Sequence, residues 1–207
     1  MSAKKKYDKQ LTIVFIFMII LLVAVTSSYY IYKSSRHFNY AGLTFYKAKE
    51  GNLDLILTYF PLYNSSVDVF ASLPYYLRND PRKLAYIEIK DKLQVNNSVG
   101  VVIDDSLGNC SEGNLADLQL SVFLEEIKKK TFTGTFNRTL AQNISGLQYV
   151  NCSIADNYSI LAFRAGNESM IFKENKCYIL EVKDCEMMKV AERFIIGLDA
   201  HANNIVI

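Results

Sequence analysis

Residues 99–136, "VGVVIDDSLGNCSEGNLADLQLSVFLEEIKKKTFTGTF", decide the fold of this chain. They open with VGVVID, a near-continuous apolar run that is typical of a central strand buried on both faces. They close with TFTGTF, which predicts a second strand. Residues 114–130 lie between these runs and predict a helix. Strand, helix and strand in this order predict a βαβ unit with two parallel strands and a right-handed crossover.

The predicted helix over 114–130 has one apolar face, formed by Ala116, Leu120, Phe123, Leu124 and Ile127. We expect Asn114 to be its N-cap, because an Asn side chain accepts hydrogen bonds from the free N–H groups of a first turn. Three lysines, residues 128–130, end this helix, where positive charge complements the helix dipole.

The sequence on either side predicts further strands and a second helix. Residues 158–182 predict an antiparallel meander of three strands, with turns at Gly166-Asn167 and Glu174-Asn175. Asp184 is expected to cap a final helix over residues 185–200, whose apolar stripe packs on the sheet. The predicted fold class is therefore α/β, with one mixed-sheet α/β sandwich domain over residues 43–200 and at least two packed helices.

Two segments before the decisive stretch also predict strands. Residues 41–60 predict a pair around a turn at 49–52. After a turn at Asn79-Asp80-Pro81, we expect a strand with Leu84 and Tyr86 on one face. We assign both segments to the same domain.

The N-terminus predicts a membrane anchor. A basic tail, residues 1–10, precedes an apolar run, and the segment 11–32 forms about 33 Å of helix at ~1.5 Å per residue, which is enough to cross a bilayer. Tyr29, Tyr30 and Tyr32 suit the membrane interface, and the basic flank predicts a cytoplasmic N-terminus. The prediction is a single-pass plasma-membrane protein with an extracellular C-terminal domain, a juxtamembrane linker at 33–42 and a C-terminal tail at 201–207.

Two alternatives to this anchor stay open. The basic and apolar regions also fit a cleaved signal peptide. A pilin-like filament subunit is the other alternative, although Lys9-Gln10-Leu11 lacks the small residue that usually precedes the processing point. In each case the rest of the chain is exported.

Asn-x-Ser/Thr triplets are unusually frequent. Chance placement of the chain's 16 Asn and 24 Ser and Thr predicts roughly two acceptor triplets, but eight are present. This excess predicts N-glycosylation outside the cell, in surface loops. The triplets begin at Asn64, Asn96, Asn109, Asn137, Asn143, Asn151, Asn157 and Asn167.

All four cysteines, Cys110, Cys152, Cys177 and Cys185, follow the predicted anchor. An even number in an exported body predicts two disulfides. The sequence does not choose among the three pairings. The pair 177–185 is disfavoured if a straight strand of about 16 Å separates the two residues, because bridged Cα atoms lie within about 7 Å.

The candidate catalytic residues are few. Asp104 and Asp105 follow the predicted central strand, where α/β proteins commonly hold ligands, and Asp156 is a third candidate carboxylate. Together they offer acid/base chemistry for a surface hydrolase, or they are turn and cap residues. His37 and His201 lie far from the cysteines in sequence and no C-x-x-C pair occurs, so we expect no metal site.

We also expect no cofactor and no nucleic-acid partner. The glycines of LGNCSEGN match neither a phosphate-binding loop nor a dinucleotide fingerprint. Residues 1–36 carry a net charge of +5 and the whole chain +2, so the body is mildly acidic and lacks the basic stripe of a nucleic-acid binder.

The chain resembles a group of uncharacterised archaeal single-pass membrane proteins. The resemblance rests on the anchor, on "YYLRNDPRKL", on the strand-Cys-helix segment from Val101, and on "GNESMIFKENKCYILEVKDCEMMKVAERFI". It implies an archaeal envelope protein and no particular activity. The predicted function is an interaction or structural module of the cell surface, with an envelope protein or polymer as its partner.

Overall fold

The computed structural model describes the chain apart from residues 1, 35, 65–68, 109, 154–156 and 206–207. The side chains of residues 2–13, 31–34, 62–64 and 69–71 also lie outside the description. The chain divides into two compact units, Met1–Phe38 and Asn39–Ile207.

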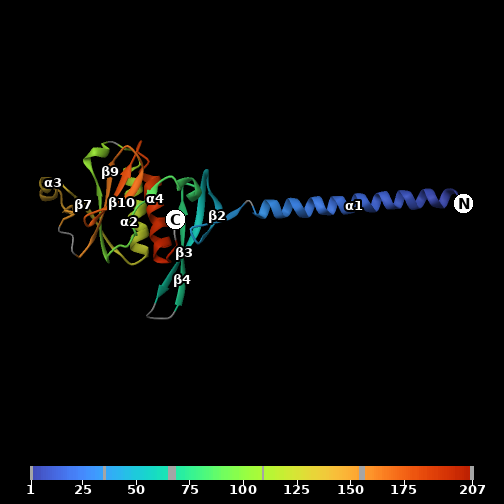
Figure 1. Cartoon of the computed structure of the whole chain (residues 1–207), viewed down its shortest axis with the longest axis horizontal. Helices are drawn as coiled ribbons and strands as arrows, with labels where there is room; N and C mark the ends of the chain where they lie inside the picture. Colours follow the sequence, from blue (N-terminus) through green and yellow to red (C-terminus); the bar gives the residue numbers. More distant parts are fainter. Residues whose placement is uncertain (1, 35, 65–68, 109, 154–156, 206–207) are drawn as a thin grey trace. The chain divides into compact units, whose positions relative to one another are not determined.

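The first unit is dominated by one helix, α1 (Ser2–Ser34) (Figure 1). Between Val14 and Tyr30 its large apolar side chains are each more than half exposed. Among the described residues, no helix combines the length and the hydropathy required of a membrane span.

The second unit contains two β-sheets, apart from the first two residues of β1. The smaller sheet has the strand order β1-β2-β3-β4, and its members are β1 (His37–Tyr40), β2 (Leu43–Glu50), β3 (Leu53–Asn64) and β4 (Val69–Leu77). The larger sheet has the order β5-β10-β11-β9-β6-β7-β8. Its strands are β5 (Glu88–Ile89), β6 (Ser98–Ile103), β7 (Lys130–Thr135), β8 (Gln148–Tyr149), β9 (Ser159–Ala165), β10 (Met170–Glu174) and β11 (Cys177–Val182).

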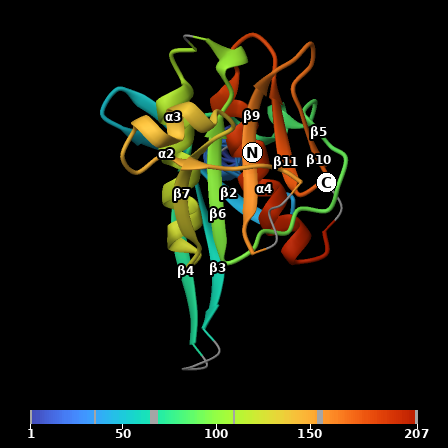
Figure 2. The same cartoon turned by 90° about the vertical axis from the view of Figure 1, so that its left-hand side faces the viewer.

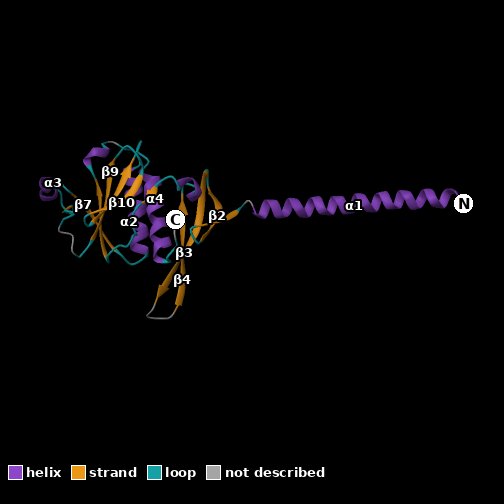
Figure 3. Cartoon of the chain, in the orientation of Figure 1, coloured by secondary structure: helices purple, strands orange, loops and turns teal. Residues whose placement is uncertain are grey.

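Two helices, α2 (Gly113–Glu126) and α4 (Met187–Ala202), form a layer between the two sheets (Figure 3). The ring of Phe123 in α2 lies 5.0 Å from that of Phe60 in the smaller sheet. On the other side, the ring of Phe194 in α4 lies 6.2 Å from that of Tyr178 in β11. Because α4 packs against several elements at once, it is buried almost all round, which explains why its apolar surface is wider than a single stripe.

A buried carboxylate joins the smaller sheet to α4. Glu192 is fully buried and accepts hydrogen bonds from the backbone N–H groups of Arg78 and Asn79, at 2.6 and 3.1 Å. The Asn79 side chain donates a third bond at 2.8 Å. Burial raises the pKa of Glu192, although these hydrogen bonds oppose the rise. The chain leaving β4 is therefore fixed against α4 by polar contacts within an apolar layer.

The predicted βαβ unit is confirmed. Strands β6 and β7 pair in parallel, with Val101 opposite Thr133, and α2 connects them. The predicted cap is wrong, because α2 already begins at Gly113 and Glu112 occupies the N-cap position without a side-chain hydrogen bond. Asn114 lies inside the helix.

The predicted antiparallel meander is wrong. Strand β11 lies between β9 and β10, parallel to β9 and antiparallel to β10 (Figure 2). The burial of the strands supplies a physical reason. β9 and β11 are apolar on both faces and buried over most of their length, whereas β10 is largely half-exposed or exposed. Central positions suit the two apolar strands, so β10 takes the place nearer the edge.

Several boundaries also differ from prediction. The predicted strand with Leu84 and Tyr86 on one face is instead the 3₁₀ turn η1 (Pro81–Leu84), and these side chains are 1% and 56% exposed. The helix α4 has Glu186 at its N-cap, and Asp184 precedes it in a left-handed conformation with φ of 50°.

The single predicted sheet is two sheets, because the first hairpin, β2 and β3, pairs only within the smaller one. The linker predicted at 33–42 contains β1, and the tail predicted from residue 201 begins inside α4.

Candidate functional site

Several side chains meet where the parallel strands of the larger sheet end. Asp104 follows β6, Phe136 follows β7, Asn151 follows β8, and Arg164 lies near the end of β9. These four strands are parallel, so their carboxyl ends share one edge of the sheet. A cavity of about 370 Å³ begins there and extends over the sheet face toward the start of β11. We call it the carboxyl-end groove; its polar and aromatic residues are Asp104, Phe136, Tyr149, Asn151, Arg164 and Glu174.

The floor of this groove is the sheet face that points away from α2 and α4 (Figure 2). Ala162 and Ile179 line the groove, and both belong to the buried cluster on this face. Val150, only 2% exposed, packs into the same cluster from the segment that forms one wall. The wall is thus supported by apolar contacts.

A disulfide also fixes that wall. Cys152 is bonded to Cys177 at the start of β11, with Cα atoms 5.2 Å apart. The N–H of Val150 donates to the carbonyl of Thr135 at 3.0 Å, and the N–H of Lys176 donates to the carbonyl of Cys152 at 3.2 Å. The wall is therefore held both by backbone hydrogen bonds and by a covalent bond.

Arg164 is the basic group of the groove. Its guanidinium forms ion pairs with Glu174 at 3.2 Å and with Glu181 at 3.5 Å, and it lies 5.7 Å from the ring centre of Phe172. These contacts hold the planar group in one orientation. The guanidinium has five N–H donors, so two carboxylates leave donors for a ligand.

Two aromatic rings border the groove, and neither was predicted from the sequence. Phe136 and Tyr149 are each 36% exposed. Arg138 of the short helix α3 (Arg138–Asn143) lies 4.9 Å from the ring centre of Tyr149. Arg164 and Glu174 were missed as well. The available signal was position along the parallel strands: Phe136 follows β7, Tyr149 ends β8, and Arg164 is the last residue but one of β9.

The predicted carboxylate cluster is not brought together by the described residues. Asp104 lines the groove, but its carboxylate also accepts the N–H of Ser106 at 2.8 Å and caps the turn η2 (Asp105–Leu107). Asp105 is exposed and does not line the groove. Asp156 lies outside the described residues. Within the described part of the chain, no group of three or more His, Cys, Asp or Glu residues is arranged to hold a metal ion.

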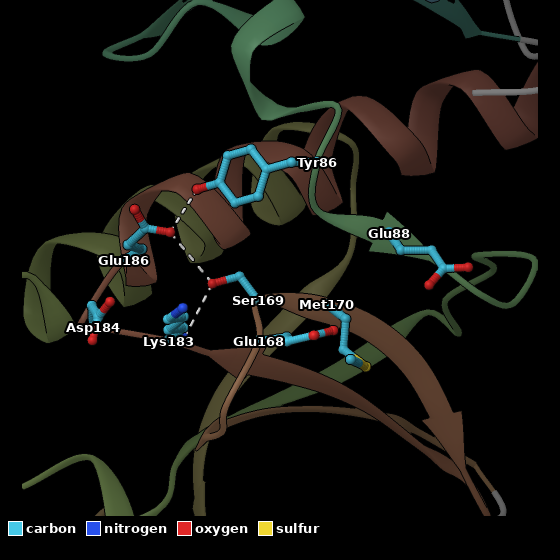
Figure 4. Close-up of a pocket in the computed structure, with 8 residues that line it drawn as sticks. All are labelled: Tyr86, Glu88, Glu168, Ser169, Met170, Lys183, Asp184 and Glu186. Carbon is cyan, nitrogen blue, oxygen red and sulfur yellow. Dashed lines mark hydrogen bonds between the residues drawn. The ribbon is translucent and has the colours of Figure 1, made fainter.

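A second cavity, of about 360 Å³, lies beside the start of α4 (Figure 4). Its Glu186 accepts hydrogen bonds from the Tyr86 hydroxyl at 2.5 Å and the Ser169 hydroxyl at 3.4 Å, and pairs with Lys189 at 2.5 Å. Burial raises the pKa of Glu186, but the bonds from Lys189, Tyr86 and Ser169 lower it overall. This carboxylate is ionised and already well supplied with donors, so it fixes the start of α4 and does not suit a general base.

One cysteine and two histidines that could carry chemistry lie outside the groove. Cys110 is bonded to Cys185, with Cα atoms 5.4 Å apart, so it is no free thiol. His201 accepts the N–H of Leu93 through Nδ1 at 2.9 Å. Burial, followed by the charges of Lys92 and Arg193, lowers its pKa, which keeps the ring a neutral acceptor. His37 lies exposed in β1.

Most asparagines of the glycosylation triplets lie on the surface. The exposed ones are Asn96, Asn137, Asn143, Asn157 and Asn167, whereas Asn151 is half-buried in the groove. Asn109 lies outside the described residues, as does the side chain of Asn64. The hydroxyl residues Ser159 and Ser169, two positions after Asn157 and Asn167, are each only 6% exposed.

Comparisons with protein-family models, with curated proteins and with solved structures found no match.

The clearest indication of the compartment in which the chain works comes from its cysteines. All four cysteines are paired in two disulfides, as predicted. Disulfides of this kind are formed in oxidising compartments and indicate a protein that acts outside the cytoplasm.

Proposed function

We propose that this chain is a membrane-anchored, N-glycosylated protein of the cell surface, whose body acts as an interaction module of the envelope. The observation that carries the proposal is the complete pairing of the cysteines. The two bonds join residues 75 and 25 positions apart, so each fixes elements that are distant in sequence. Such bonds persist in an exported body and not in the reducing cytoplasm.

The anchor rests on α1. Its apolar side chains from Val14 to Val25 are exposed, and a lysine-rich segment precedes them. A bilayer would cover such a surface, and the basic flank would remain in the cytoplasm. Tyr29 and Tyr30 would lie at the opposite interface.

The glycans rest on the exposed triplets. Asn137 and Asn143 stand at the two ends of α3, and both are exposed. Asn96 and Asn167 are exposed in other parts of the body. Surface position is the requirement that these sites share.

Binding is favoured over catalysis by the roles of the described carboxylates. Asp104 caps a turn, Glu186 is ionised and paired with Lys189, and Glu192 is buried under backbone N–H groups. The groove, in contrast, offers aromatic surface and a fixed arginine. These features suit recognition of a partner.

The test is a topology experiment on the full-length chain in a host that N-glycosylates exported proteins. Intact cells are treated with a protease that does not cross the membrane, and non-reduced peptides are analysed by mass spectrometry. We expect cleavage of the body, sugar on several triplets and the bridges 110–185 and 152–177. Protection of the body, with unmodified asparagines and free thiols, would reverse the proposed orientation.

The same sample separates the two alternatives to the anchor. A mature N-terminus beyond residue 25 in a protein released to the medium would indicate a cleaved signal peptide. Processing near Lys9, with large assemblies that dissolve only in detergent, would indicate a filament subunit. We expect neither, because the proposal requires an intact α1 in the membrane fraction.

A further inference from the structure

We propose that the carboxyl-end groove binds a saccharide, about one or two pyranose rings of an envelope glycan held without a covalent bond. The inference deepens the proposed function, since it depends on a body that faces the envelope. The volume of the groove, about 370 Å³, lies at the lower end of the range for small-molecule sites.

The aromatic rings supply the first argument. One face of a pyranose carries C–H bonds, and such a face packs on an aromatic ring. Phe136 and Tyr149 border the groove with about a third of their surface exposed. The small side chain of Ala162 in β9 leaves room on the floor of the groove.

The polar groups supply the second argument. Sugar hydroxyls pair with planar side chains that offer two donors or two acceptors. The groove has acceptors in Asp104 and Glu174 and donors in Arg164. One arginine and two carboxylates give no cationic surplus for a phosphate, so a neutral sugar fits the charge better than an anion does.

The third argument is that the site is already rigid. Arg164 is held by Glu174, Glu181 and the ring of Phe172, and the opposite wall is bonded to β11 through Cys152. Little ordering is needed on binding, so a modest contact area can give measurable affinity.

A second source of the same chemistry is the chain itself. Asn151 begins a glycosylation triplet and lines the groove. Its Oδ1 accepts the N–H of Ser153 at 2.9 Å, which engages the oxygen and not the nitrogen that would carry a sugar. We commit to the free glycan, and the attached one is an outcome of the test.

The experiment uses the full-length chain in detergent, made in an oxidising host without N-glycosylation and, separately, in a glycosylating one. The probes are tetrasaccharides of glucose, mannose and N-acetylglucosamine, with inorganic phosphate as the anionic comparison. Saturation transfer from protein to sugar protons detects binding, and a titration gives Kd. We expect at least one tetrasaccharide to bind and phosphate not to compete.

Two variants place the binding. Phe136→Ala and Tyr149→Ala should each weaken it about tenfold. Tyr76→Ala is the matched control, because Tyr76 is a 47% exposed tyrosine on the smaller sheet, away from the groove. The affinity of this variant for the saccharide should equal that of the parent chain. If Tyr149→Ala fails to form both disulfides, Tyr149→Leu keeps apolar packing without the ring and replaces it.

Three results would overturn the inference: no tetrasaccharide binds, the control loses as much as the groove variants, or phosphate competes. A fourth is binding that appears only in Asn151→Gln when the parent carries sugar at Asn151, because the groove then holds the chain's own glycan. None of these four results changes the outcome of the topology experiment. If that experiment places the body in the cytoplasm, the proposed function is wrong, whatever the purified chain binds.

Discussion

The two faces of the larger sheet are covered in different ways. The inner face lies under α2 and α4, whose apolar side chains form the layer between the sheets. The outer face is covered by residues 136–153 and by Tyr158, and the regular elements described there are the six-residue helix α3 and the two-residue strand β8. A disulfide holds this cover to β11. The inner face therefore provides most of the stability, and the outer face provides a surface that the protein can use for binding.

The largest expected effect compares one phenylalanine from each face. Phe163 of β9 is fully buried on the inner face, and Phe172 of β10 is half-buried on the outer face. Phe163→Ala should lower the free energy of unfolding by about 4 kcal/mol, and Phe172→Ala by about 1 to 2 kcal/mol. Chemical denaturation with both disulfides intact measures the two values. Equal losses would contradict the assigned difference between the faces.

Removal of the outer disulfide should have the next largest effect. The double variant Cys152→Ala/Cys177→Ala opens a loop of 25 residues and should cost about 3 kcal/mol. Hydrogen exchange should rise in residues 136–153 and stay unchanged in the middle of α2 and α4. The matched variant Cys110→Ala/Cys185→Ala should instead loosen the starts of α2 and α4. If both double variants lost saccharide binding to the same extent, the segment that covers the outer face would have no role in binding distinct from that of the helix layer.

A smaller effect concerns pH and belongs to the helix layer. Burial raises the pKa of Asp199 to about 6, opposed in part by a hydrogen bond from Asn203, and among the described residues its Oδ2 has no hydrogen-bond partner. The folded state then binds the proton more tightly than the unfolded state, so stability falls as pH rises from about 4 to 6. Asp199→Asn should flatten this fall and gain about 1 kcal/mol at pH 7, after allowance for partial exposure.

Thermal unfolding of the parent and Asp199→Asn chains from pH 3.5 to 7.5 checks this prediction. Asp117→Asn is a useful comparison, because burial also raises the pKa of Asp117, which hydrogen-bonds Ser121. Parallel curves for the parent and the Asp199→Asn chain would show that Asp199 does not titrate in this range.

The smallest expected effect is that of Asp104→Asn at the edge of the outer face. Asn caps a turn about as well as Asp does, so stability should change by less than about 0.5 kcal/mol. The saccharide Kd should change no more than a few-fold, because one acceptor oxygen remains. Any glycan hydrolysis by the parent chain that this variant abolishes would show that the groove is a hydrolase site.

The sequence predicted the elements better than it predicted their arrangement. The βαβ unit was readable because VGVVID is apolar throughout and the helix after it has one clear apolar face. The order of β9, β10 and β11 could not be predicted in the same way. Local turn signals are the same whether the third strand adds to the edge of a meander or lies between the two strands that precede it. The separation into two sheets could not be predicted either. The sequence of α4 indicates which of its positions are apolar, but it does not indicate how many layers pack against the helix.

The site was only partly predictable for a related reason. Asp104 was located correctly as a residue that follows a central strand. Phe136 and Tyr149 have ordinary sequence surroundings, and only the parallel pairing of β7 with β8 brings them to the same edge. Arg164 meets Glu174 across β11, which depends on the strand order that local sequence does not encode.

The position of β11 has a consequence for how the protein is made. This strand completes the larger sheet between β9 and β10, both of which are synthesised before it. Cys110 is likewise synthesised before its partner Cys185, which follows 75 positions later, or roughly 4 to 15 seconds at normal synthesis rates of about 5 to 20 residues per second. During that interval the larger sheet is incomplete, so Ser159 and Ser169, each only 6% exposed in the folded protein, are not yet buried. If the proposed glycosylation occurs, sugars at Asn157 and Asn167 would have to be attached before the last strand closes the sheet.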